Sequence, residues 1–200
     1  MPDFDSFNLT FSAPEKRRRE HDQYFTPQPL ADALVREYLL NNPPPSRVLE
    51  PSVGMGAWAR ACNRTVFDIV EGVDIIPRSE SEHCCSQFTC CDFLSFRPTI
   101  APSLIIGNPP YSEAESHVRH ALDIVARDGR VAFLLRLAFC ESAGRIAFWR
   151  AHPAESIHVL AERPSFTGGG TDNAAYGFFV WRKTPSGQPA KCFPGFSWRH

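Results

Sequence analysis

Residues 48–56 read VLEPSVGMG, so that a short apolar strand runs directly into a turn with two glycines. A helical pattern follows over residues 56–63, and the whole segment predicts a strand, a tight turn and a helix. Gly54 and Gly56 let the backbone pass close to a ligand, and the start of the helix offers backbone amides. A G-x-G pair alone is a weak signal, and the third glycine of the pyrophosphate-binding pattern G-x-G-x-x-G is missing. The turn therefore favours a ligand without phosphates.

Outward from this unit, β-rich runs alternate with helical patterns, which is typical of a mainly parallel α/β sheet. The expected strands are 47–51, 66–75, 87–91, 103–107, 130–137, 156–161 and 175–183. The expected helices are 56–63, 112–128 and 140–152, preceded by one that begins at Thr26 and Pro27, with Thr26 as N-cap, and ends at the NNPPP of residues 41–45. Residues 77–86 are too polar and too rich in cysteine to assign. The last two strands are joined by a loop with three consecutive glycines and no helix, which predicts an antiparallel pair.

Length and composition indicate one soluble domain. A chain of 200 residues with 43% hydrophobic and 22% charged residues can bury a core without disulfides. We expect an irregular N-terminal arm at 1–23, a domain at 24–183 and a tail at 184–200. The sequence has no apolar run of 18 residues and no secretory signal pattern, and its seven cysteines are an odd number. These features predict a cytoplasmic protein with reduced thiols and no membrane span.

Composition does not name a ligand. A zinc site can be drawn from His83, Cys84, Cys85, Cys90 and Cys91, but the spacing lacks paired C-x2-C units, so we expect no metal. The net charge of −1 gives no global basic field. The basic run at residues 16–19 fits a solvated face as well as a phosphate contact.

Asp74 comes at the end of the second expected strand, about twenty residues after the glycine turn. An acid at this place can accept hydrogen bonds from the two ribose hydroxyls of an adenosine. The alternative is an acid that only caps a turn at the end of the strand. The glycine turn before it favours the ribose interpretation.

Residues 104–111 read LIIGNPPY and carry the most specific signal in the chain. An apolar strand ends abruptly on Pro109 and Pro110, whose rings fix the backbone and make the loop rigid. The loop offers the Asn108 carboxamide, a stiff backbone carbonyl and the Tyr111 ring. These groups suit a primary amine on a planar ring, which needs two acceptors and a stacking surface. Asn-Pro is also a common turn dipeptide, but α/β proteins bind ligands at the carboxyl ends of such strands.

Taken together, these motifs resemble the NPPY amino-methyltransferases of the seven-stranded Rossmann-like class, and within that class the γ-type N6-adenine DNA methyltransferases. The resemblance covers about residues 22–183. Its motifs occur in the family's order: Tyr24-Phe25-Thr26-Pro27, then residues 50–56, Asp74, Asp92-Phe93-Leu94 and Asn108-Pro109-Pro110-Tyr111. The resemblance implies a mainly parallel sheet with an antiparallel last strand, helices on both faces, and S-adenosyl-L-methionine as cofactor.

The resemblance also implies roles for single residues in the cofactor site. Thr26, in the motif that begins at Tyr24, would hold the methionine carboxylate. Asp74 would bind the ribose, and Asp92 the adenine amine with Phe93 beside the ring. The remaining expected cofactor residues would line the methionine end: Glu50, Gly54 and Gly56.

At the acceptor end, the resemblance makes residues 108–111 the catalytic loop. Asn108 and the carbonyl of Pro109 would accept hydrogen bonds from the target N6, while Pro110 stiffens the loop. Tyr111 would stack on the target base and Phe166 would lie on its opposite face. For Phe166, an ordinary core phenylalanine is the competing interpretation.

The implied activity is direct in-line transfer of the sulfonium methyl group to N6 of a flipped adenine in DNA. The large target-recognition domain that γ-type enzymes usually append is missing after residue 183. Recognition is therefore expected from a partner protein or from self-association. Three alternatives remain: N6-adenine methylation of RNA, glutamine methylation of a protein, and a non-catalytic cofactor-binding subunit. The glutamine methyltransferases lack the Tyr-Phe-Thr-Pro segment, and an intact NPPY loop argues against a non-catalytic subunit.

Overall fold

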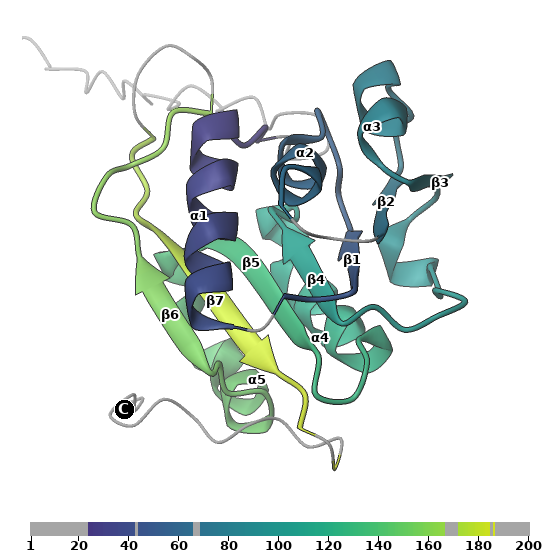
Figure 1. The fold of residues 1–200 in the computed structure, drawn as a ribbon. Helices are drawn as coiled ribbons and strands as arrows, with labels where there is room; N and C mark the ends of the chain where they lie inside the picture. The colour runs from purple at the N-terminus through teal and green to yellow at the C-terminus, as the bar shows by residue number, and fades with distance from the viewer. Residues whose placement is uncertain (1–23, 43, 66–68, 167–171, 185, 187–200) are drawn as a thin grey trace, which may run out of the picture.

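The computed structural model describes residues 24–42, 44–65, 69–166, 172–184 and 186 (Figure 1). Its centre is a seven-stranded sheet in the order β3-β2-β1-β4-β5-β7-β6. The strands are β1 (Arg47–Glu50), β2 (Ile69–Asp74), β3 (Gln87–Cys90), β4 (Leu104–Gly107), β5 (Arg130–Arg136), β6 (Ser156–Val159) and β7 (Tyr176–Arg182). β7 runs antiparallel to both β5 and β6, and the other neighbouring strands are parallel. This confirms the Rossmann-like seven-stranded fold with an antiparallel last strand.

Helices cover both faces of the sheet, as expected. The helices are α1 (Gln28–Asn41), α2 (Ala57–Asn63), α3 (Ser79–Cys84), α4 (Ala114–Ile124) and α5 (Ile146–Ala151). One core cluster joins α1 and α2 to one face of the sheet through Leu34, Trp58, Ile106 and Phe178. The other joins α4 and α5 to the opposite face through residues such as Val118 and Trp149. Since β4 is covered on both faces, its residues form a continuous apolar run, which is typical of a buried parallel strand.

Several local boundaries differ from the predictions, among them the following. Thr26 is not the N-cap of α1: that position is Pro27, and the Thr26 hydroxyl instead accepts a hydrogen bond from the buried Trp58 indole at 3.0 Å. The expected helix 140–152 is helical only from the 3-10 turn Ala143–Arg145 through α5, because Ser142 has a φ of 113° that no helix accommodates. The unassigned residues 77–86 contain α3.

Some expectations lie outside the described residues. These are the N-terminal arm at 1–23 with its basic run, residues 66–68 of the second expected strand, the three glycines at 168–170, and nearly all of the tail at 184–200. The domain limits at 24 and 183 therefore stay predictions.

The strand order places a topological switch between β1 and β4. From β1 the chain moves outward to β2 and β3 and then returns to the other side of β1 as β4. The connections on the two sides of this point lead away from each other, which leaves a crevice at the carboxyl ends of the strands where α/β proteins bind ligands. Two of the motifs begin here, the glycine turn directly after β1 and Asn108 directly after β4.

Candidate functional site

Two neighbouring cavities occupy this crevice. The larger is an open cleft of about 650 Å³, lined by residues that include Gly54, Asp74, Asp92, Phe93, Asn108 and Pro110. The smaller, of about 250 Å³, is lined by residues that include Thr26 and Glu50. Both are also lined by Tyr24, Phe25, Ser52, Gly54 and Asn108. The structure thus brings together every residue expected to bind the cofactor except Gly56.

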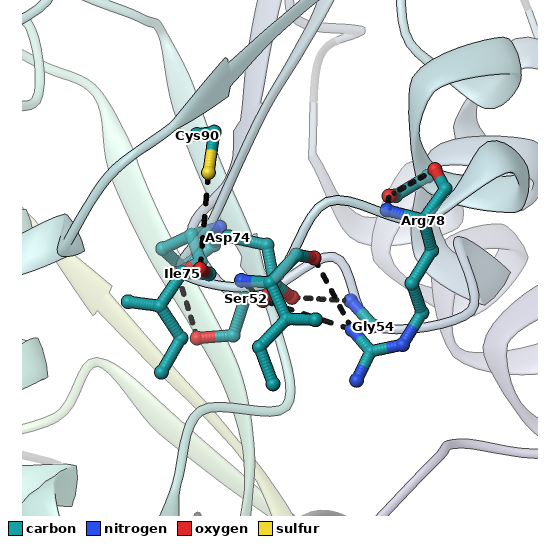
Figure 2. A network of polar contacts seen from close by, with 9 residues as sticks. Ser52, Gly54, Asp74, Ile75, Arg78 and Cys90 are labelled. Carbon is teal, nitrogen blue, oxygen red and sulfur yellow. Dashed lines mark hydrogen bonds and ion pairs between the residues drawn. The ribbon is translucent and has the colours of Figure 1, made fainter.

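Asp74 holds the glycine turn in place (Figure 2). Its Oδ2 accepts a hydrogen bond from the Gly54 amide at 2.7 Å, and its Oδ1 accepts one from the Ile76 amide at 2.9 Å. Arg78 adds an ion pair at 3.8 Å. The side chain therefore caps the turn, as the alternative interpretation of this acid has it. It also lines the larger cavity, where a ribose would meet the same carboxylate.

Gly56 serves the fold and does not line either cavity. It is the N-cap of α2 with a φ of 78°, a left-handed conformation that disfavours other residues. A Cβ at this position would collide with the Sγ of Cys84 on α3. The backbone conformation and the close packing against Cys84 therefore suffice to explain why glycine occupies this position.

Glu50 is a buried acid with an unsatisfied oxygen. Its side chain is 1% exposed, and its Oε2 accepts a hydrogen bond from the Ala59 amide at 2.7 Å. Its Oε1 is buried and has no hydrogen-bond partner among the described residues. Burial raises the pKa of Glu50 well above its ordinary value, and the neighbouring Cys84 adds to the rise. Because Glu50 lines the smaller cavity, a donor or cation bound there would satisfy the free oxygen.

Asp92 and Phe93 form the far side of the larger cavity. The Oδ1 of Asp92 accepts a hydrogen bond from the Leu94 amide at 2.9 Å and caps the 3-10 turn Phe93–Ser95. The Phe93 ring is 2% exposed and stacks on the ring of His117 with centroids 5.2 Å apart. His117, from α4, also lines this cavity and was not predicted. Its signal in the sequence was a histidine next to Val118 on the apolar side of an expected helix.

Asn108 has a defined side-chain orientation at the junction of the two cavities. Its Nδ2 donates a hydrogen bond to the carbonyl of Tyr24 at 2.9 Å. Its Oδ1 is buried and has no hydrogen-bond partner among the described residues. Since the amide nitrogen is engaged, the oxygen is the atom left to accept a hydrogen bond from a ligand.

Tyr111 lies in a cluster of rings that we call the aromatic cluster: Tyr24, Tyr111, Phe166 and Tyr176. The Tyr24 ring contacts both Tyr111 at 5.2 Å and Phe166 at 5.7 Å between centroids. The Arg136 guanidinium lies over Tyr24 and Tyr111 at 5.1 and 4.8 Å. Burial raises the pKa of Tyr111. The two rings expected to hold the target base are thus linked through Tyr24, which the resemblance had assigned to the cofactor.

Phe166 fits both of its interpretations. It packs on the core cluster that includes residues of α1, and its ring centroid lies 5.2 Å from that of Tyr176.

Sequence reasoning missed Arg136 and Tyr176, which lie on adjacent strands β5 and β7 in direct register. Arg136 donates to the Tyr176 hydroxyl at 3.2 Å. The one signal in the sequence for Arg136 was its position at the carboxyl end of an expected strand.

In the part of the chain that the structure describes, no three His, Cys, Asp or Glu side chains are grouped to hold a metal ion. The six cysteines found there are free thiols. The same part contains no helix of the length and apolarity needed to span a membrane.

Comparison with known proteins supports the fold. No protein-family model matches the sequence. Over 115 residues, 56% of this chain, it is 29% identical to the type II methyltransferase M.CvrRI of Paramecium bursaria Chlorella virus XZ-6E, and the match spans only 30% of that protein. The structure is similar to the N-methyltransferase NodS from Bradyrhizobium japonicum WM9 in complex with S-adenosyl-L-homocysteine, with a TM-score of 0.58, 15% identity, and coverage of 78% of this chain and 86% of NodS.

The structure is also similar to the M protein of the type I restriction enzyme EcoKI, with a TM-score of 0.62 and 16% identity. That likeness covers 83% of this chain and 45% of the M protein. The α/β fold is therefore that of S-adenosylmethionine-dependent methyltransferases that bind this cofactor or its demethylated product.

Proposed function

We propose that this chain transfers a methyl group from S-adenosylmethionine to the N6 amine of adenine in DNA. The observation that carries the proposal is the Asn108 amide, whose nitrogen is engaged by Tyr24 and whose buried oxygen lies unpartnered at the cofactor cleft. An acceptor in this orientation selects a substrate that donates a hydrogen bond, and an exocyclic amine does so.

The residues of the two cavities fit the cofactor. The free Oε1 of Glu50 needs a donor, and the methionine ammonium group supplies one together with a positive charge. Thr26 lines the same cavity, so the ammonium and the carboxylate at the amino-acid end of the methionine moiety would both find polar partners. Asp74 and Asp92 line the larger cavity, where the ribose and adenine would lie.

Bound S-adenosylmethionine supplies an electrophilic methyl group, and transfer forms an N–C bond as the S–C bond breaks and the sulfur keeps the electron pair. Asn108 and the Pro109 carbonyl orient the N6 lone pair toward that methyl group by accepting the two N6 hydrogens. As nitrogen becomes positive, both oxygens stabilise the developing charge, and one hydrogen then leaves as a proton to solvent. Pro110 keeps the loop rigid, so that little reorganisation is needed.

The target base would stack on Tyr111 within the aromatic cluster. Tyr24 and Arg136 contact the Tyr111 ring, so the base has to displace one of them to reach it. Stacking on an aromatic ring contributes about 1–3 kcal/mol per base, which offsets much of the cost of flipping it from a duplex.

The names of two similar proteins, a type II methyltransferase and a restriction-enzyme M protein, favour DNA as the acceptor. The match covers 30% of the first protein and 45% of the second. We propose that a partner protein or self-association contributes to target recognition.

The experiment is transfer of an isotope-labelled methyl group to DNA, total RNA and protein fractions in parallel. Nucleoside mass spectrometry then identifies the product, and we expect N6-methyladenine in DNA. A label found only in RNA or on glutamine would reassign the acceptor, and 4-methylcytosine would reassign the base. No transfer by wild-type protein that binds S-adenosylhomocysteine would contradict catalysis and favour a cofactor-binding subunit.

A further inference from the structure

His117 is a buried polar residue that lines the larger cavity. It lies on α4 with 3% of its surface exposed, and it lines the cavity beside Asp92 and Phe93. Its ring stacks on Phe93, with 29° between the ring planes. Its Nε2 is not one of the fully buried atoms that lack a partner, so a ligand in the cavity can reach this nitrogen.

The hydrogen bonds of His117 define its tautomer. Its Nδ1 lies 3.1 Å from the carbonyl of Glu113, one helical turn earlier. A carbonyl can only accept, so Nδ1 carries the hydrogen and Nε2 of the neutral ring is an acceptor. Burial lowers the pKa of His117 to about 4, which keeps the ring neutral at physiological pH. Nε2 makes no hydrogen bond with the described residues.

The surroundings of this nitrogen match one part of the cofactor. Asp92 uses Oδ1 to cap the turn that holds Phe93, so its second oxygen remains as an acceptor, and Asp92 lines the same cavity as His117. Two acceptors beside an aromatic ring suit a planar ligand that carries an amine with two hydrogens. The adenine ring of the cofactor has such an amine.

We propose that His117 is an adenine-recognition residue, whose Nε2 accepts the second hydrogen of the cofactor's N6 amine while Asp92 accepts the first. This inference rests on the proposed cofactor, but it does not depend on the methyl acceptor. In this proposal, both α4 and the Asp92-Phe93 turn contribute to distinguishing adenine from other purines.

The test compares two ligands by calorimetry: S-adenosylhomocysteine and its analogue with hydrogen in place of the N6 amine. His117→Phe keeps a ring beside Phe93 but removes the acceptor. The matched control is His120→Phe, because His120 also contacts the Phe93 ring at 4.7 Å yet does not line the cavity. We expect His117→Phe to weaken S-adenosylhomocysteine about tenfold, the effect of one hydrogen bond in a buried site. The deaminated analogue should bind His117→Phe and wild type equally, and His120→Phe should leave both affinities at the wild-type level.

If His117 only packs against Phe93, the substitution will weaken both ligands by the same factor, and the proposal is wrong. A measurement on the wild-type chain covers the case in which His117→Phe does not fold. The ¹⁵N resonance of His117 Nε2 should shift on binding S-adenosylhomocysteine and stay in place with the deaminated analogue, and equal shifts would overturn the assignment. If neither ligand binds wild type, the proposed function itself fails, which is a different result from binding that is insensitive to His117.

Discussion

Replacing Asn108 with alanine tests the catalytic loop most directly, because the structure offers a matched control. Asn108→Ala removes the 2.9 Å hydrogen bond to the Tyr24 carbonyl and also the unpartnered Oδ1 acceptor. Asn42→Ala removes a bond of the same kind, because Asn42 Nδ2 donates to the Tyr38 carbonyl at 2.9 Å. Asn42 lines neither cavity. Asn42→Ala therefore controls for the loss of the donated hydrogen bond, and Asn108→Ala adds the loss of an acceptor that lines the cavities.

The structure sets different magnitudes for stability and for turnover. Each substitution removes one partly buried hydrogen bond, so we expect both to lower the free energy of unfolding by about 1 kcal/mol. Losing one partner of a developing charge costs about 2.7–4 kcal/mol in the transition state, or roughly a hundredfold to a thousandfold in kcat. Asn108→Ala should therefore lose about a hundredfold or more in turnover, whereas Asn42→Ala should keep the wild-type rate.

The assay is single-turnover methyl transfer with labelled S-adenosylmethionine at saturating DNA, which separates chemistry from product release. Calorimetry with S-adenosylhomocysteine runs alongside it, because Asn108 lines both cavities and its effect on cofactor binding has to be measured. We expect the Kd to change far less than the rate of transfer. If Asn108→Ala transfers methyl groups at the rate of Asn42→Ala, the loop does not hold the acceptor amine and the proposed chemistry is refuted.

Three further substitutions test the cofactor side of the site and the turn that supports it. Burial raises the pKa of Glu50 in the folded chain above its ordinary value of 4.5. Above pH 4.5, folding therefore takes up a proton, and the free energy of unfolding falls as the pH rises. Urea unfolding of Glu50→Gln should show a weaker fall between about pH 5 and 8, and a fall equal to that of wild type would contradict the raised pKa. Gly56→Ala should lower the free energy of unfolding by about 1–3 kcal/mol in the same assay. Adding Cys84→Ala should recover the share of this loss that comes from the collision with Sγ. If nothing is recovered, the whole loss comes from the left-handed backbone conformation. Asp74→Asn keeps one acceptor for the Gly54 amide but loses the one for the Ile76 amide, so it should fold with a small loss of stability. Calorimetry should show weaker binding of S-adenosylhomocysteine, and wild-type affinity would leave Asp74 as a turn cap only.

Much of the fold could be predicted from the sequence because its signals are local. Apolar runs such as that of β4 mark buried strands, and Pro109 and Pro110 end β4 by removing backbone donors. The glycine-rich loop after β6 could not carry a parallel crossover, and the resulting antiparallel β7 was predicted correctly. The breaks in the expected helix 140–152 were not foreseen, because the backbone conformation at Ser142 leaves no pattern in the sequence.

For the candidate site, the sequence could predict which residues lie together but not the contacts that each of them makes. Motif order placed Glu50, Asp74 and Asp92 in one site, and the structure gathers them around neighbouring cavities. Their roles toward the cofactor remain predictions, as does that of Asn108. His117 escaped notice because a lone histidine in a helix has no period or spacing that distinguishes a cavity position from a core position.

By itself, the sequence determined the seven strands, most of the helices, the turn after β1 and the rigid loop after β4, since each depends on neighbours in the chain. Tertiary structure alone decided which partner each polar atom has. The Thr26 hydroxyl accepts a hydrogen bond from the Trp58 indole, and the Asn108 nitrogen donates one to a carbonyl 84 residues away. The Asn108 Oδ1 is thereby left without a hydrogen-bond partner among the described residues. Such pairings depend on how distant segments pack, because a buried donor must find an acceptor wherever the fold brings one within reach.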